Sequence, residues 1–152
     1  MSYNNDDDAS EQRHLFKIEE KSRQILRKFN KRAETSGYQS LPELWQDFAG
    51  VIKATIHLST PQAVQHLLQY TSEFHDYCEA YKEDTELNEY NEYFEAMDFA
   101  WCSVLSNHEI GQTDKVRIVN ILRDGQDRAA QLGLTMLVYP HATDKADDEF
   151  DS

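Results

Sequence analysis

The chain has few of the residues that break helices and form tight turns. It contains five glycines and three prolines among 152 residues. A fold made of many short strands needs turn residues at short intervals, so this scarcity argues against an all-β protein. The length suits a single domain whose core is large enough to fold without disulfides or metals.

Cysteine and long apolar runs are also scarce. Only Cys78 and Cys102 are present, fewer than a disulfide-stapled secreted domain needs. No apolar run is long enough to span a bilayer. Residues 1–10 are polar and acidic and lack the apolar stretch of a signal peptide. We therefore expect a cytoplasmic protein in which both thiols are reduced and packed as small hydrophobic side chains.

Recognisable catalytic and metal-binding motifs are missing. There is no Gly-rich phosphate loop, no His-Glu-x-x-His and no Gly-x-Ser-x-Gly. Glu11 and His14 have the Glu-x-x-His spacing of di-iron bundles, but a di-iron site needs two such pairs and two more glutamates. His75 and Cys78 have the spacing of a thiolate pair, but the surrounding acids disfavour a thiolate. We expect no enzyme, no metal and no cofactor.

Basic residues are in short supply and unevenly placed. The chain has 28 acids against 15 bases, a net charge of −13. Residues 11–34 hold eight bases and four acids, which is +4, so the rest of the chain carries −13 − 4 = −17. Such a balance disfavours direct contact with nucleic acid or an anionic membrane and attracts basic protein surfaces.

Apolar residues recur at steps of three and four along most of the chain, which predicts an all-α fold, a compact bundle of about five helices. Start signals support the boundaries: Ser40 followed by Pro42 and Glu43, Thr60 before Pro61, and Thr85 as a cap. The helices are expected at 11–34, 41–58, 60–82, 86–105 and 115–131. Residues 11–140 form the helical domain, and 1–10 and 141–152 are expected to be disordered acidic tails.

Three positions in this scheme carry specific expectations. Trp45 and Trp101 lie on apolar stripes and are expected in the core. Gly125 should weaken the middle of its helix by about 1 kcal/mol relative to alanine. The segment 134–139 fits a short strand, a last helical turn or an extended piece packed on the core.

The most distinctive stretch is Tyr70–Trp101. It holds ten acids and one base, Lys82, for a charge of −10 + 1 = −9, and nine of the chain's 17 aromatics. A break at 83–85 predicts an antiparallel helix hairpin in which residues whose numbers sum to 168 are level. Six carboxylates would then lie opposite the apolar stripes of their own helices and form one surface. These are Glu73, Asp76, Glu79, Glu89, Glu92 and Glu95, with Tyr77 and Tyr93 beside them.

Such a surface is either a solvated outer face or a binding site. Charge runs are usually solvated faces. Level carboxylates repel one another, however, and almost no lysine or arginine is interleaved to form stabilising pairs. A purely structural surface normally mixes charges of both signs.

The sequence thus predicts a non-catalytic acidic binding protein that docks its carboxylate face on a basic partner protein. The most concrete version is an inhibitor that imitates DNA and blocks a nucleic-acid-binding protein. The six carboxylates would replace phosphates, and Tyr77 and Tyr93 would add apolar contact area. The alternative is an adaptor or subunit of a larger assembly that uses apolar helix faces and the segment 134–139. The partner and the oligomeric state do not follow from the sequence.

Overall fold

The computed structural model describes the backbone of residues 2–151 and the side chains of residues 8–147. Within residues 2–151 the chain forms six helices and no strand, which confirms the all-α prediction. The helices are α1 (Ser2–Asn30), α2 (Leu41–Thr55), α3 (Thr60–Ala80), α4 (Leu87–Asn107), α5 (Gln112–Gln131) and α6 (Pro140–Asp151).

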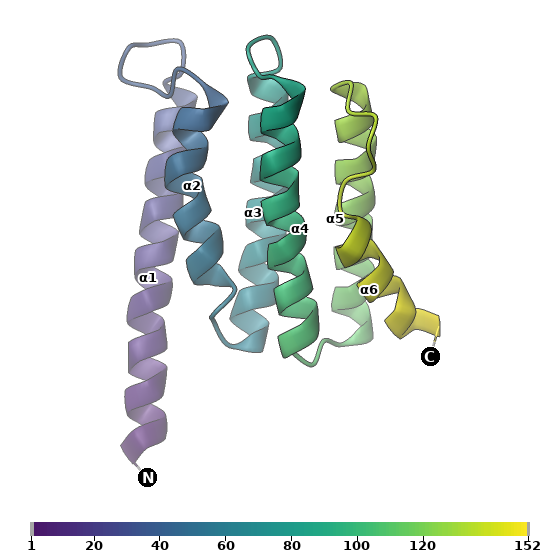
Figure 1. Ribbon diagram of the computed structural model, residues 1–152. Coiled ribbons are helices and arrows are strands. Elements are labelled where there is room, and N and C mark those ends of the chain that lie inside the picture. The colour runs from purple at the N-terminus through teal and green to yellow at the C-terminus, as the bar shows by residue number, and fades with distance from the viewer. Residues whose placement is uncertain (1, 152) are drawn as a thin grey trace.

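The helices form three antiparallel pairs placed side by side in two layers (Figure 1). We call α2, α4 and α6 the front layer and α1, α3 and α5 the rear layer. Contacts run within each pair, between neighbours in a layer (α2 with α4, α4 with α6 and α3 with α5) and across the layers from α2 to α3. The core therefore lies between the layers, and α3 and α4 occupy its centre. The N-terminal part of α1 extends past the end of α2 (Figure 1).

The prediction of five helices and of disordered tails was wrong. Residues 2–10 continue α1, and 140–151 form α6, while residues 1 and 152 lie outside the described part. α6 is held by burial of Ala142 and Ala146, both 0% exposed. The buried carboxylate of Asp98 on α4 accepts the Ala142 N–H at 2.8 Å and so caps α6 from another helix. A cap from a distant helix has no local signature, which is why the sequence pattern missed it.

The predicted α3–α4 hairpin is present in nearly the predicted register. The Tyr90 hydroxyl donates to the Cys78 carbonyl at 2.8 Å, and 78 + 90 = 168. Farther along, the Trp101 indole N–H donates to the Thr71 hydroxyl at 2.9 Å. Both bonds are buried and join the apolar stripes of the two helices. The hairpin thus closes with its apolar faces turned toward each other.

Local start signals explain where two of these helices begin. The Glu43 N–H donates to the Ser40 hydroxyl at 3.3 Å, which confirms Ser40 as the cap of α2. The cap of α4 is Glu86, not the expected Thr85. The Thr85 hydroxyl instead donates to the Tyr81 carbonyl at 2.7 Å, and the Glu89 carboxylate accepts the Glu86 N–H at 3.0 Å.

The segment 134–139 is irregular and packed on the core, the third of the predicted alternatives. Val138 and Tyr139 are buried, whereas Met136 and Leu137 expose 68% and 65% of their surface. Tyr139 has a φ of 56°, a left-handed conformation that a side-chain-bearing residue adopts only where its surroundings impose it. Its hydroxyl lies 2.8 Å from Nε2 of the buried His75 on α3.

Gly125 makes room for this contact. A Cβ at position 125 would lie 2.5 Å from His75 Nε2 and 2.6 Å from Tyr139 Cε2. Neither ring has space to move, because both are buried and hydrogen-bonded to each other. The glycine is therefore required for α5 to approach α3.

This close approach reverses the expectation from helix propensity. Gly125→Ala is expected to destabilise the protein by about 1–3 kcal/mol through overpacking, although alanine is the better helix former. The control is Gly50→Ala in α2, where an added Cβ meets nothing within 4 Å. That change should stabilise by about 0.5–1 kcal/mol. Urea unfolding of each variant gives the change in its free energy of unfolding. An increase for both variants would contradict the packing at Gly125.

Candidate protein-binding surface

The two rows of predicted site carboxylates point in opposite directions. Each row lies opposite the apolar stripe of its own helix, and those stripes face each other across the α3–α4 pair. The α3 row therefore belongs to the rear layer and the α4 row to the front layer (Figure 1). The single six-carboxylate surface expected from the hairpin is not formed, because the hairpin spans both layers instead of lying on one side of the core.

Two members of the α3 row are paired within the fold. Arg128 of α5 lies 2.9 Å from the Asp76 carboxylate and 3.7 Å from that of Glu79. Asp124 also contacts this guanidinium at 3.4 Å. These ion pairs join α3 to α5, so Asp76 and Glu79 have an intramolecular role.

Glu73, the third member of the α3 row, is partly buried. One of its carboxylate oxygens accepts the Gln69 side-chain N–H at 3.1 Å, and the other has no hydrogen-bond partner among the described residues. Burial raises the pKa of Glu73 above its ordinary value. Such a side chain is poorly placed to contact another protein.

The two tyrosines of the predicted site lie in the core. Tyr77 is 1% exposed and Tyr93 is 4% exposed. Tyr77 packs 4.6 Å from the Phe29 ring, and Tyr93 stacks 4.6 Å from the Trp45 ring. The apolar contact area expected from them is therefore not available at the surface. Both positions were expected to flank the acidic stripe, but each helix is surrounded on more than one side.

The α4 row is divided between a cap and a free surface. Glu89 accepts the N–H of Glu86, the capping residue of α4. Glu92 and Glu95 are exposed, and neither forms an ion pair with any residue in the range 8–147. Phe99, one turn farther along the same face, is 69% exposed. The outer face of α4 thus combines two free carboxylates with a large exposed aromatic ring.

A groove runs beside this face, between α2 and α4. It has a volume of about 240 Å³ and is lined almost entirely by apolar side chains. The lining residues are Trp45, Ala49, Ile52, Lys53 and Ile56 of α2 with Ala96, Phe99 and Ala100 of α4. Trp45 is partly buried and packs against the core as expected, and the rest of its surface lines the groove. The exposure of Phe99 and this groove are features that the sequence reasoning missed.

The bases of α1 do not balance the α4 carboxylates. Lys21 lies 3.9 Å from Asp47 and Lys28 lies 3.8 Å from Glu43, both on α2. Arg23 pairs with Glu20 of its own helix at 3.0 Å. The bases of α1 therefore pair mainly with carboxylates of α1 itself and of α2.

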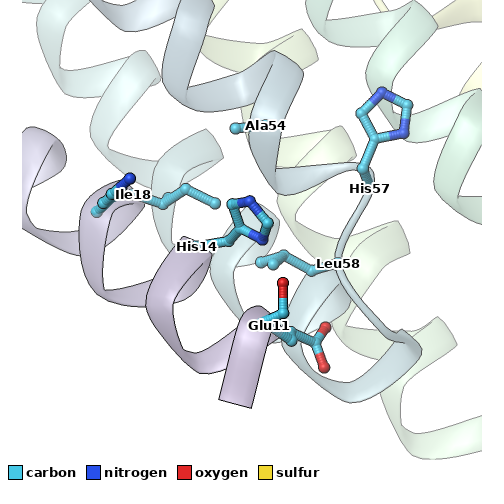
Figure 2. A pocket seen from close by; sticks show the side chains of 8 residues that line it. Glu11, His14, Ile18, Ala54, His57 and Leu58 are labelled. Atoms are coloured by element: carbon cyan, nitrogen blue, oxygen red, sulfur yellow. The ribbon is translucent and has the colours of Figure 1, made fainter. Parts of the chain in front are cut away.

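A second pocket lies between α1 and the end of α2, with a volume of about 660 Å³ (Figure 2). His14 extends into it, whereas the ring of His57 points away from His14 (Figure 2). The Glu11 carboxylate accepts the backbone N–H of Ser59 at the start of α3. Nowhere among residues 8–147 do three or more His, Cys, Asp or Glu side chains gather in a way that could hold a metal ion. Glu11 thus joins α1 to the start of α3.

The histidine and the thiol near the acidic segment, His75 and Cys78, are both buried. Cys78 is buried, and burial raises the pKa of its thiol well above the ordinary value. His75 faces Tyr139 rather than the thiol, and it is 1% exposed. Cys102 is partly buried, and neither cysteine forms a disulfide.

Of the helices in the described part of the chain, none is long and apolar enough to cross a membrane. Comparisons of the chain with protein-family models, with curated proteins and with solved structures find no match.

Proposed function

We propose that this chain is a non-catalytic binding protein that docks the outer face of α4 on a basic surface of a partner protein. The observation that carries the proposal is the pair Glu92 and Glu95, exposed beside Phe99 and without an ion pair among residues 8–147. Unpaired like charges destabilise an isolated fold by repulsion. Exposed aromatics are common anchors of interfaces. A docking role for the outer face of α4 accounts for both the unpaired carboxylates and the exposed aromatic ring.

A narrower form of the proposal concerns the kind of partner. A nucleic-acid-binding protein presents lysines and arginines where phosphates dock, and carboxylates can occupy that surface. An inhibitor of this kind would use Glu92 and Glu95 in place of phosphates. Asp76 and Glu79 contribute less, since Arg128 already contacts them.

The alternative function is that of an adaptor or subunit in a larger assembly. The exposed side chains of Met136 and Leu137, between α5 and α6, favour it. Apolar side chains that protrude from an irregular segment are suited to burial against another chain. Such an interface would depend little on the carboxylates.

The salt dependence of partner binding distinguishes the two proposed functions. The immobilised protein is incubated with extract of its source cells at low and at high salt, and retained proteins are identified by mass spectrometry. Docking through carboxylates predicts a basic partner that is retained at low salt and released at high salt, because charge–charge contacts are screened. Retention that is equal at both salt concentrations favours the adaptor, and no retained protein at either concentration contradicts both.

Duplex DNA tests the narrower form. If the captured partner uses its nucleic-acid surface, added DNA should displace the immobilised protein in proportion to its concentration. A partner that binds DNA and the immobilised protein at the same time would rule out phosphate imitation and leave the general proposal intact.

A further inference from the structure

We infer that the α2–α4 groove binds a short amphipathic helix of the partner, with its apolar stripe in the groove and its lysines or arginines over Glu92 and Glu95. The inference rests on the proposed function and specifies the chemistry of the partner. It adds an apolar recognition element that a purely electrostatic docking surface would lack.

The shape of the groove suits one helix. Trp45 stacks on Tyr93, and α2 and α4 run in the same direction, so a residue on α2 is level with the residue 93 − 45 = 48 positions later on α4 (Figure 1). The lining extends from Trp45 to Ile56, which are 56 − 45 = 11 positions apart. At about 1.5 Å per residue this is about 16 Å, or three turns of a bound helix. A third helix laid between two neighbours inserts its side chains into such a gap.

The walls of the groove are apolar and one of them is prominent. Ala49 and Ala96 are small, so a side chain from another helix can approach the backbone between them. Phe99 stands at the rim with 69% of its surface exposed. A hydrophobic groove is the kind of surface into which an amphipathic helix lays apolar anchors at i, i+3 and i+7.

Charge complementarity gives the occupant its composition. By the same offset of 48, Glu92 and Glu95 are level with positions 44 and 47, at the Trp45 end of the groove. Lys53 lies toward the other end and is exposed. A bound helix is therefore expected to carry lysines or arginines near Trp45, with apolar residues along the centre.

The probe is a synthetic peptide of leucine and lysine, about four turns long, with its leucines on one helical stripe. A second peptide of the same composition has the order rearranged so that no stripe forms. Binding is followed by anisotropy of a dye on the peptide and by the emission of Trp45, which lines the groove. The emission change should be absent in Trp45→Phe.

Matched variants separate the apolar and the charged contributions. Phe99→Ser removes the rim aromatic, and Phe16→Ser removes a similarly exposed phenylalanine, 62% exposed, on α1. Ala96→Arg fills the groove at an exposed helical position. Glu92→Gln with Glu95→Gln removes two charges from the α4 face, and Glu83→Gln with Asp84→Asn removes two exposed charges from the α3–α4 loop.

The striped peptide should bind the wild-type protein about tenfold or more tightly than the rearranged one. Phe99→Ser and Ala96→Arg should each weaken binding by about tenfold, as truncation or blockage of an interface anchor does, while Phe16→Ser has no effect. Melting temperatures of the variants should match that of the wild type, since the substituted side chains are exposed.

The possible negative results distinguish the groove proposal from the proposed docking through the α4 carboxylates. Suppose that both peptides bind equally and that Phe99→Ser has no effect, while the Glu92/Glu95 double variant weakens binding more than the Glu83/Asp84 double variant does. This result would overturn binding of a helix in the groove, but it would still support docking through the α4 carboxylates. If the two double charge variants weaken peptide binding equally and Phe99→Ser has no effect, both the groove proposal and docking through the α4 carboxylates are overturned. Absence of any striped-peptide binding, or binding without a change in Trp45 emission, also overturns the groove.

Discussion

Replacing Trp101 by alanine is expected to lower the free energy of unfolding by about 3–5 kcal/mol. Trp101 is 0% exposed and lies between α3 and α4. Its loss would leave a cavity and also remove the 2.9 Å hydrogen bond from the indole N–H to the Thr71 hydroxyl. Chemical unfolding followed by circular dichroism gives the difference.

Trp45→Ala is the matched comparison. Trp45 stacks on Tyr93 but also lines the α2–α4 groove, where part of its surface is open. Its removal should therefore cost less than that of Trp101, since less surface is returned to water. Equal losses for the two tryptophans would mean that the groove is closed in solution, and a small loss for Trp101 would contradict the packing of α3 on α4.

Acid is expected to destabilise the fold through His75. Burial, with a further contribution from the Arg128 charge, lowers the pKa of His75 to about 4 from 6.5, while Asp76 acts in the opposite direction. Between these pH values the unfolded chain binds a proton that the folded chain excludes, so stability falls as the pH falls from 6.5 toward 4. The difference of 6.5 − 4 = 2.5 units corresponds to about 3 kcal/mol.

The test compares unfolding free energies of the wild type and His75→Phe from pH 7 down to pH about 4.5. The phenylalanine variant should lose about 1 kcal/mol less per pH unit in this interval. Tyr139→Phe removes the hydroxyl 2.8 Å from His75 Nε2 but keeps the ring buried, so its slope should follow that of the wild type. Parallel slopes for the wild type and His75→Phe would contradict the lowered pKa of His75, since the imidazole would then be hydrated or protonated beside the Asp124 carboxylate, 3.6 Å from Nδ1.

Local patterns predicted most of the helices. Caps and apolar spacing act over one or two turns, and Ser40 begins α2 as those patterns indicate. The register of α3 against α4 also followed from the position of the break, and the bond from Tyr90 to Cys78 confirms it. These features depend on residues that are close in the sequence.

Features that depend on distant residues could not be predicted. α6 depends on Asp98, which lies 44 residues before the N–H that it accepts. Gly125 appeared only as a weak point in a helix, although His75 and Tyr139 occupy the space that a side chain would need. The direction of each acidic row depends on how the helix pairs are layered, and the hairpin register alone does not contain that information.

The same limit applies to the binding surface. The sequence reasoning selected carboxylates by their position opposite an apolar stripe, and this criterion is met equally by Asp76 on α3 and by Glu92 on α4. Only the position of Arg128 beside Asp76 distinguishes them. The exposure of Phe99 was hidden for a related reason, because an aromatic in an aromatic-rich helix is normally expected to be buried.

The most direct test of the α4 surface compares two double variants that remove the same charge from opposite layers. Glu92→Gln with Glu95→Gln should leave stability unchanged or slightly raised, because two unpaired like charges are removed. The captured partner should be lost, since each charge-assisted contact contributes about 1.5–3 kcal/mol. Asp76→Asn with Glu79→Gln should keep the partner and lose at most about 1 kcal/mol of stability from the exposed pairs with Arg128. Loss of the partner with the α3 variant and its retention with the α4 variant would contradict the assignment of the binding surface to α4.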